Sequence, residues 1–319
     1  MHPCLPVLAS ESEWRFTPIS LLYDIRPIPG KGLGVVARAQ MEVGTRVLSE
    51  QPLARLSQAY NSREAASADL AVAIDKLSDS DQARFHKLSQ KGSGPKTAMG
   101  TWLTNALPIA YDDPSGGLCG STGANSNDAA VFAQISRINH ACCPNCHQEW
   151  NAGLGVETVH VIRPIDVGEE LTISYLKPGG RPRAERQAML RSRFGFDCTC
   201  SLCMLSGEAL QRSDEAQRAI GELQSPKSSP GGPGEKLRLL AQEGLPAVWG
   251  RRILLEAAMK LSRDGGNHML AAAWLKRARA LVKESCGEDG PGYAAITDLA
   301  NAVEDMARMT KQIAKAIKK

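Results

Sequence analysis

Six of the nine cysteines stand in two tight clusters, and this spacing constrains the fold more than any other feature of the 319-residue chain. The second cluster places Cys198, Cys200 and Cys203 within six residues. Three thiolates this close repel one another unless a cation holds them, and zinc in structural sites takes four tetrahedral ligands. The sequence therefore predicts a structural zinc site held by these three cysteines and one more.

The fourth ligand must come from elsewhere in the chain, and the first cluster supplies three candidates: Cys142, Cys143 and Cys146. The opening segment has no basic start and only a short apolar stretch, so it does not resemble a secretion signal. Clustered cysteines without such a signal favour metal over disulfides, with buried free thiols as the alternative. The other cysteines, Cys4, Cys119 and Cys286, stand alone.

Composition and charge exclude several classes of protein. With 43% hydrophobic and 23% charged residues the chain is expected to fold, and its length favours about two domains. No apolar run approaches the length of a membrane-spanning helix, so we expect a soluble protein with no membrane partner. The net charge of +4 is too mild to require a nucleic-acid partner. We expect the protein in the nucleus, the cytoplasm or both.

Hydrophobic alternation predicts strands in the first part of the chain, interrupted by one helical region. That region runs over residues 62–88, with a second helix start at Ser78 to Asp81. Its predicted apolar face consists of Ala65, Leu70, Ile74 and Leu77. Residues 112–128 are predicted as a loose stretch. The predicted strands cover residues 21–28, 35–39, 46–56, 156–162 and 170–176.

The last part of the chain is predicted to be helical throughout. A short basic helix over residues 184–193 precedes the second cysteine cluster, and residues 225–234 form a flexible connector. Two apolar stripes are predicted to pack in a core of antiparallel helices. The stripes are Leu270, Trp274, Ala278 and Leu281, and then Ile296, Leu299, Val303, Met306, Thr310, Ile313 and Ile317.

Two basic regions are predicted to be solvated faces. One is the end of the chain, Lys311 to Lys319. The other is the run of arginines around the short basic helix, for which an acidic partner or nucleic acid is the alternative. These arginines are Arg181, Arg183, Arg186, Arg191 and Arg193.

Four motifs follow one another in order along the chain. They are Lys31-Gly32-Leu33-Gly34; Asn139-His140-Ala141-Cys142 with Pro144-Asn145; Gly168-Glu169-Glu170-Leu171-Thr172-Ile173-Ser174-Tyr175; and Phe194-Gly195-Phe196-Asp197 before the second cysteine cluster. Together they resemble a SET-domain protein lysine methyltransferase. Thr104-Asn105-Ala106 resembles a further element of the SET and MYND branch. Residues 57–88 contain no cysteine, so the chain looks like a fungal-type member without the MYND zinc module.

The resemblance implies roles for individual residues. It implies Tyr175 as the catalytic residue, which positions the acceptor amine, and it favours Cys142 as the fourth zinc ligand. It implies S-adenosylmethionine as cofactor, bound by Lys31, Gly32, Leu33, Gly34, Asn105, Asn139, His140, Phe194 and Phe196. From the residues alone, Tyr175 is equally well a buried aromatic at a strand end, and the glycine turn an ordinary hairpin.

We therefore expect an α+β protein with a SET-domain β-fold, a helical insertion, a zinc-binding post-SET segment and an all-helical C-terminal domain. The expected boundaries are 1–56 and 105–178 for the SET core, 57–104 for the insertion, 179–207 for the zinc segment and 208–319 for the helical domain. The expected activity is methyl transfer to the ε-amine of a lysine in a histone or another protein. The alternatives are an enzyme acting on a small molecule, and a non-catalytic interaction protein.

Overall fold

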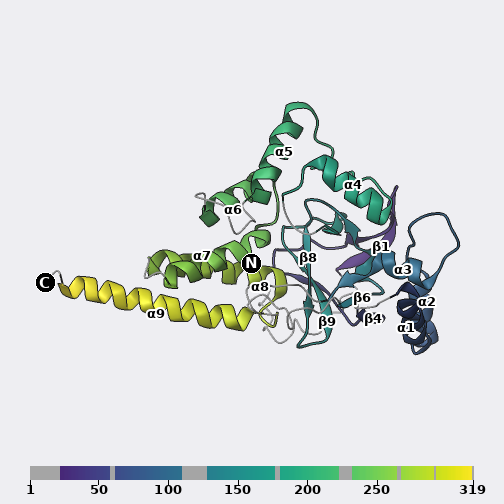
Figure 1. Cartoon of the computed structure of the whole chain (residues 1–319), viewed down its shortest axis with the longest axis horizontal. Coiled ribbons are helices and arrows are strands. Elements are labelled where there is room, and N and C mark those ends of the chain that lie inside the picture. The colour runs from purple at the N-terminus through teal and green to yellow at the C-terminus, as the bar shows by residue number, and fades with distance from the viewer. Residues whose placement is uncertain are drawn as a thin grey trace, which may run out of the picture.

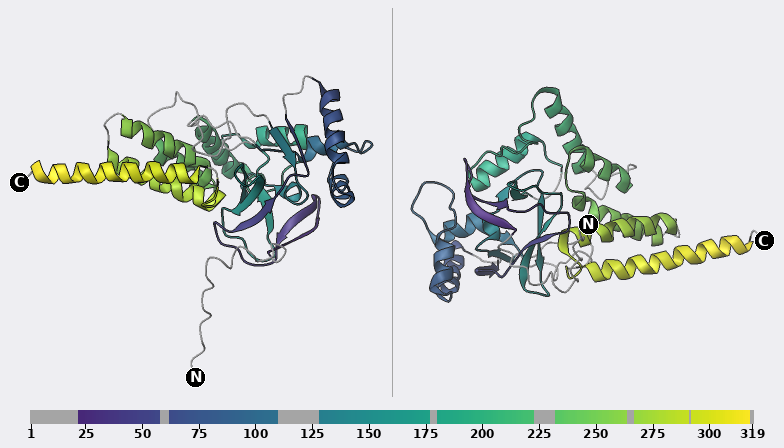
Figure 2. Two further views of the ribbon diagram at one scale, coloured as in Figure 1. Left: turned by 90° about the horizontal axis from the view of Figure 1, so that it is seen from below. Right: turned by 180° about the vertical axis from the view of Figure 1, so that it is seen from behind.

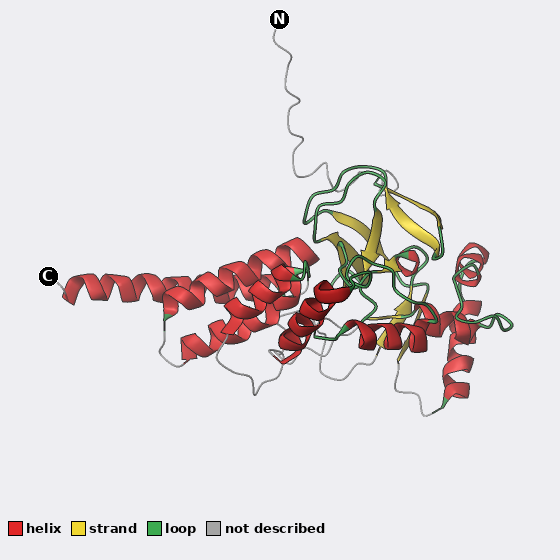
Figure 3. Ribbon diagram, turned by 90° about the horizontal axis from the view of Figure 1, so that it is seen from above, coloured by secondary structure: helices red, strands yellow, loops and turns green. Residues whose placement is uncertain are grey.

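The computed structural model describes residues 22–57, 62–109, 128–176, 180–222, 232–263, 267–290 and 292–317. Strands occupy the middle of the molecule, and helices lie on two sides of them (Figure 1; Figure 3). The opening segment, Cys4, Cys119 and nearly all of the predicted loose stretch 112–128 lie outside the described residues. Among the described residues, no helix is long and apolar enough to cross a membrane.

The strands form three small sheets. The first has the order β1 (Tyr23–Ile28), β2 (Gly32–Ala37), β10 (Glu170–Ile173) and β7 (Asn139–His140). In this sheet β1, β2 and β10 pair antiparallel, whereas β10 and β7 pair parallel. The second sheet has the order β3 (Arg46–Glu50), β9 (Val156–Val161) and β8 (Cys146–Asn151). The third has the order β4 (Ala54–Ser57), β6 (Asp128–Val131) and β5 (Leu107–Pro108).

Three strand predictions need correction. The strand predicted over 35–39 begins earlier, at Gly32, because the hairpin turn lies before it, where the Lys31 N–H donates to the Ile28 carbonyl at 3.0 Å. The strand predicted over 46–56 is two strands in different sheets, since Pro52 has no N–H to continue a ladder. The strand predicted over 170–176 ends at Ile173, so Tyr175 follows the strand and is not part of it.

The helical insertion consists of α1 (Arg63–Asp75), α2 (Asp79–His86) and α3 (Ala98–Asn105). The predicted second start is confirmed, because the Ser78 hydroxyl accepts from the Asp81 N–H at 3.2 Å and so caps α2. Leu70 and Ile74 are buried as predicted, but Ala65 is exposed. These helices and the third sheet share a hydrophobic core around Phe85, and Figure 1 shows them beside β4 and β6.

The helices after the strands are α4 (Arg183–Phe194), α5 (Gly207–Glu222), α6 (Gly232–Gln242), α7 (Arg251–Arg263), α8 (His268–Cys286) and α9 (Tyr293–Ile317). Two short 3-10 turns, η3 (Ile135–Arg137) and η4 (Ala247–Gly250), complete the elements. The helix predicted over 184–193 is confirmed as α4. Part of the predicted connector 225–234 lies outside the described residues, and its last three residues already belong to α6.

The predicted helical stripes are only partly buried. In α8, Ala278 and Leu281 are buried as predicted, whereas Leu270 is 40% exposed and Ala271 and Leu275 are buried instead. In α9 the first part of the stripe is buried, as at Ile296 and Val303, but Met306 and Ile313 are exposed. The reason is visible in both views of Figure 2, where the end of α9 extends beyond α7 and α8 and away from the strands.

The second sheet is buried on both faces, since α8 packs against β8 and β9. This contact buries an ionic cluster. The Glu149 carboxylate lies 2.9 Å from Arg251 and 3.0 Å from the His147 ring. Burial by itself raises the pKa of Glu149, but Arg251 and His147 outweigh it and lower this pKa to about 2.

Glu157, on the neighbouring strand β9, has the opposite environment. Its side chain is fully buried, and neither carboxylate oxygen has a hydrogen-bond partner. Burial, with the negative charge of Glu149 adding to it, raises the pKa of Glu157 well above its usual value. The folded protein therefore holds a proton there that the unfolded chain releases at a lower pH.

We expect Glu157→Gln to stabilise the protein at neutral pH, because the amide needs no proton, whereas the buried acid must take one up on folding. The parent loses stability as pH rises above the pKa of about 4.3 in the unfolded chain, so the gain from the substitution should shrink toward pH 4. Glu149→Gln is the matched control with the opposite sign. It should destabilise the protein at neutral pH, and its deficit should shrink as pH falls toward 2. Denaturant unfolding from pH 2 to pH 8 measures both, and a pH-independent gain for Glu157→Gln would contradict this account.

Candidate active site

A cavity of about 360 Å³ opens where the first sheet meets the helical insertion and the start of the second cysteine cluster. Six separate segments line it: the β1–β2 turn, the loop 88–91, the end of α3, residues 136–137 with 139–140, Tyr175, and Phe194 with residues 196–199. Gly32 and Gly34 do not line it. The residues from the sequence prediction that do line it are Lys31, Leu33, Asn105, Asn139, His140, Tyr175, Phe194 and Phe196.

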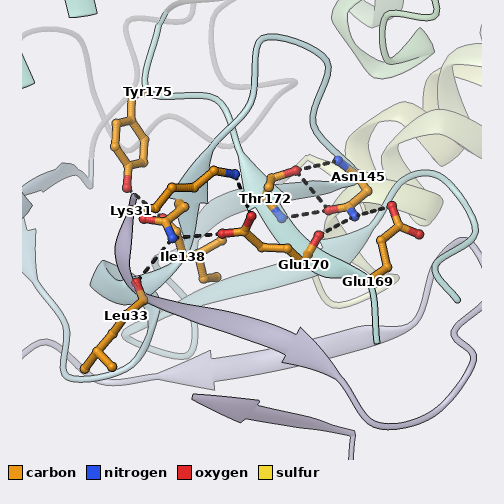
Figure 4. Close-up of polar contacts among 9 residues, drawn as sticks. Lys31, Leu33, Ile138, Asn145, Glu169, Glu170, Thr172 and Tyr175 are labelled. Atoms are coloured by element: carbon orange, nitrogen blue, oxygen red, sulfur yellow. Dashed lines mark hydrogen bonds and ion pairs between the residues drawn. The ribbon is translucent and has the colours of Figure 1, made fainter. Parts of the chain in front are cut away.

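The parallel pairing of β7 with β10 brings the Asn-His motif beside the segment that ends in Tyr175. Thr172 pairs with Asn139, and Ile173 pairs with His140. The buried Asn145 side chain holds the chain that follows β7 against β10: its Oδ1 accepts from the Thr172 N–H at 2.7 Å, and its Nδ2 donates to the Glu170 carbonyl at 2.9 Å (Figure 4). The motif residue Asn145 therefore positions the site without lining the cavity.

Glu170 links two of the predicted cofactor residues. One of its carboxylate oxygens lies 2.7 Å from the Lys31 ammonium, and the other accepts from the Asn139 amide at 2.8 Å (Figure 4). The same amide also donates to the Leu33 carbonyl at 3.2 Å. The Asn139 amide thus donates both of its protons to groups of the protein, and these two hydrogen bonds hold the side chain in one orientation between β2 and β10.

Gly34 is required at its position because there is no space for a side chain. A Cβ atom there would lie 2.6 Å from Ile28 Cγ1, 2.8 Å from the Asn139 amide nitrogen and 2.9 Å from the Glu170 carboxylate. The glycine therefore permits the close approach on which the contact between Lys31, Glu170 and Asn139 depends.

The Tyr175 hydroxyl points into the site and donates to the Ile138 carbonyl at 2.8 Å (Figure 4). Burial, with the nearby carboxylate of Glu170, raises the pKa of Tyr175 above its usual value. The phenol is therefore neutral at physiological pH. Because its single proton is engaged by Ile138, its oxygen presents only lone pairs to the cavity.

Three rings lie around Tyr175 and form an aromatic wall with it. The Tyr175 ring centroid lies 4.9 Å from that of Phe194, 5.3 Å from that of His140 and 6.3 Å from that of Phe196. Phe194 and Phe196 are half-buried and line the cavity, so they combine packing with exposure to a ligand. Such a wall suits a flat ring or a cation in the cavity.

His140 connects this wall to the cysteines. The Tyr175 N–H donates to His140 Nδ1 at 3.0 Å. In a neutral imidazole the proton then resides on Nε2, which lies 3.3 Å from the Cys142 sulfur. The side chain thus bridges the segment at Tyr175 and the first cysteine cluster.

The sulfurs of Cys142, Cys198, Cys200 and Cys203 lie within 4.8 Å of one another. Cys142 is 3.5 Å from Cys203 and 3.9 Å from Cys198, sulfur to sulfur. Zinc–sulfur bonds of about 2.3 Å in a tetrahedron would set the sulfurs about 3.8 Å apart, so this four-sulfur cluster has dimensions that suit zinc. The Gln187 side chain exchanges two 2.8 Å hydrogen bonds with the backbone of Cys198 and holds the cluster against α4.

The two other candidates from the first cluster point elsewhere. The Cys143 thiol donates to the Gly244 carbonyl at 2.6 Å, and Cys146 is buried in the core between the sheets. Asn105 lines the cavity, but its amide donates to the carbonyls of Ser89 and Thr101, both at 2.7 Å, so only its oxygen is available to a ligand.

Sequence reasoning missed part of the cavity wall. Gln90 and Lys91 come from the loop between α2 and α3, where no motif marks them, and the Lys91 ammonium donates to the Ser192 carbonyl of α4. Ser136 and Arg137 belong to η3, directly before the Asn-His motif. Their position next to that motif was the only signal for them. Glu170 lay within a quoted motif, but its contact with Lys31 required the fold.

Comparison with known proteins identifies the domain. Residues 32–176 match the family model of the SET domain. Histone-lysine N-methyltransferase set5 of Schizosaccharomyces pombe is 32% identical over 200 residues, which cover 62% of this chain and 55% of that protein. Human histone-lysine N-methyltransferase SMYD3 is 33% identical over 106 residues, which cover 31% of this chain and 24% of that protein.

A solved structure titled as the SET domain of LSMT bound to lysine and AdoHcy aligns over 92% of this chain and 89% of that chain, at 12% identity and a TM-score of 0.36. Part of the chain, residues 32–176, therefore matches the SET domain, and the similar relatives of this chain are named as lysine methyltransferases. It spans about half the length of set5 and about a quarter of the length of SMYD3.

We expect Gly34→Ala to reduce the free energy of unfolding by about 1 to 3 kcal/mol, because the new methyl group displaces Asn139 and Glu170. Gly94→Ala is the matched control, since a Cβ at Gly94 meets nothing within 4 Å and its backbone is not in the left-handed region. That control should be neutral or slightly stabilising. Chemical denaturation measures both, and equal stabilities for the two variants would show that the space at Gly34 is not limiting.

Proposed function

We propose that this protein is an S-adenosylmethionine-dependent methyltransferase that modifies the ε-amine of a lysine in a protein, a histone or another one. The observation that carries the proposal is that one cavity gathers the Lys31 turn, the Asn139-His140 pair and Tyr175. Its volume of about 360 Å³ is in the range of small-molecule sites. The names of the similar relatives support the same activity.

When bound, the cofactor supplies a methyl group on a positively charged sulfur. We assign its binding to the residues that line the cavity around that motif: Lys31, Leu33, Asn105, Asn139, His140, Phe194 and Phe196. Gly32 and Gly34 act indirectly by shaping the turn. The aromatic rings suit both the purine and the positively charged sulfur of the cofactor. Stacking of a base on such a ring contributes on the order of 1 to 3 kcal/mol.

Tyr175 orients the acceptor. Its hydroxyl proton is held by the Ile138 carbonyl, so the oxygen can accept a hydrogen bond from an incoming amine. A neutral phenol with a raised pKa is no base, so it does not remove the amine's proton. The acceptor must therefore arrive neutral, and the half-buried, aromatic surroundings favour this because desolvation lowers the pKa of a lysine.

The four-sulfur cluster is the proposed structural zinc site, with Cys142, Cys198, Cys200 and Cys203 as ligands. A site with four protein ligands has no open position for substrate, so the metal would support the fold and take no part in the chemistry. Because Cys198 also lines the cavity, this support would extend to the cavity wall.

The proposed organisation follows from these assignments. Residues 1–56 and 105–178 form the SET core, 57–104 the insertion, 179–207 the post-SET zinc segment and 208–319 a helical C-terminal domain. Action on histones or other nuclear and cytoplasmic proteins would place the enzyme in the nucleus, the cytoplasm or both.

We expect Tyr175→Phe to slow methyl transfer by roughly a hundredfold or more at saturating cofactor, because it removes one preorganised polar contact at the reacting centre. Cofactor affinity and melting temperature should change little, since the ring packing stays. Tyr23→Phe is the matched control: its hydroxyl also makes one hydrogen bond, to Gln134 at 2.8 Å, but does not line the cavity.

The assay uses radiolabelled cofactor and a cell extract separated into proteins and small molecules. Equal rates for the parent and Tyr175→Phe, with equal stability, would remove Tyr175 from the mechanism. If the label appears only in small molecules, the substrate is a small molecule and not a protein. If the parent binds the cofactor but transfers no methyl group to any fraction, a non-catalytic role is favoured.

The metal assignment has its own test. Elemental analysis of the purified protein should find one zinc per chain, and Cys200→Ser should lose it with a marked fall in melting temperature, since structural zinc binding is coupled to folding. Cys143→Ser should keep the zinc, because its thiol points to Gly244. Well under one zinc in the parent, or an unchanged melting temperature in Cys200→Ser, would refute the site.

A further inference from the structure

Arg186 contradicts the prediction that the arginines around α4 form a solvated face. Arg191 and Arg193 are exposed as predicted, but Arg186 is only 6% exposed. It lies in the first turns of α4, on the face that α4 turns toward the four-sulfur cluster. A buried guanidinium is always charged and is costly to hold without an anion. The position therefore requires a source of negative charge.

The polar contacts of Arg186 identify that source. Nη1 donates to the Arg181 carbonyl at 2.5 Å, Nη2 lies 3.9 Å from the Cys203 sulfur, and Nε is buried with no hydrogen-bond partner. No carboxylate among the described residues forms an ion pair with this guanidinium. The thiolates are then the anions that this buried cation faces.

An external anion is a poor alternative. The cavity beside Arg186 measures about 20 Å³ and is also lined by Cys142 and Gln217. This is room for one water molecule and for no phosphate or carboxylate. The neighbouring Arg183 uses its Nη1 on the carbonyls of Cys203 and Leu205, at 3.4 and 3.0 Å, so it orients the backbone around the cluster.

Charge balance explains why such a cation is needed. Four thiolates around one Zn²⁺ carry a net charge of about −2 in a largely buried place, which is unfavourable without compensation. On the Cys142 side, His140 supplies only a neutral N–H at 3.3 Å. We propose that Arg186 is the counter-ion of the four-sulfur metal centre. This inference rests on the proposed zinc site and makes Arg186 a positioning residue of that site.

The test compares zinc affinity, measured by competition with a chromogenic chelator, in the parent, Arg186→Gln, Arg186→Lys and Arg191→Gln. Outer groups that support metal ligands typically contribute 10- to 100-fold to affinity, and we expect Arg186→Gln to lose about this much. Arg186→Lys should recover part of the loss because it restores the charge. Arg191→Gln, on the exposed face of the same helix, should match the parent.

A second measurement separates a counter-ion from a residue needed only for packing. Melting temperatures are recorded with saturating zinc and after chelation. A counter-ion makes Arg186→Gln less stable than the parent mainly in the zinc-bound form, whereas a packing residue lowers both forms equally. If Arg186→Gln does not fold, Arg186→Lys is compared with the parent instead. The two measurements are again the zinc affinity and the melting temperatures with zinc and after chelation.

The outcomes distinguish this inference from the zinc proposal itself. A parent that binds no zinc overturns both. A parent that binds one zinc, with Arg186→Gln holding it as tightly and melting equally in both states, overturns only the role of Arg186. Equal loss for the Lys and Gln variants would also overturn it, since the charge would then be irrelevant.

Discussion

The site depends on the hydrogen bonds that the buried Asn145 side chain makes with β10. The pairing of β7 with β10 involves two residues on each strand, which is too short to be stable alone. Asn145 satisfies the Thr172 N–H and the Glu170 carbonyl, and its own N–H lies 3.4 Å from the Thr172 hydroxyl. Leaving such groups unpaired in the core would cost about 1 to 3 kcal/mol each. These bonds hold the chain that follows β7 against β10 and so support the pairing that sets Asn139 and His140 beside Tyr175.

The cavity and the sulfur cluster form one unit in this fold. His140 lines the cavity, accepts from the Tyr175 backbone and faces the Cys142 sulfur. Cys198 contributes its sulfur to the cluster and also lines the cavity. A change in the cluster therefore moves atoms of the cavity wall directly, without an intervening layer. Under the proposed function, this arrangement gives a physical reason for a structural metal that takes no part in the chemistry.

The sequence predicted those parts that depend on local chemistry. The four motifs lie around one cavity, α4 follows the predicted bounds closely, and Ser78 caps α2 as expected. The sequence predictions fail where contacts between segments far apart in the chain determine the structure. The break between β3 and β4 follows from the transfer of the chain to another sheet, and the burial of Arg186 follows from a sulfur cluster whose members no helical pattern reveals. Only the start of the α8 stripe differs from the prediction, because this helix packs on α7, α9 and the second sheet together.

Burial has two effects in the aromatic wall, and under the proposed function both favour the same reaction. Removing the Tyr175 phenol from water raises its pKa, so the oxygen stays neutral and keeps its proton on the Ile138 carbonyl. The same removal from water lowers the pKa of an incoming lysine, because there it is the protonated form that carries the charge. A phenol of ordinary pKa near 10 is neutral at physiological pH in either environment, so the larger effect falls on the amine, which a polar cavity would keep protonated. By keeping water from the site, the rings of Phe194, Phe196 and His140 would favour the neutral amine that the proposed reaction needs.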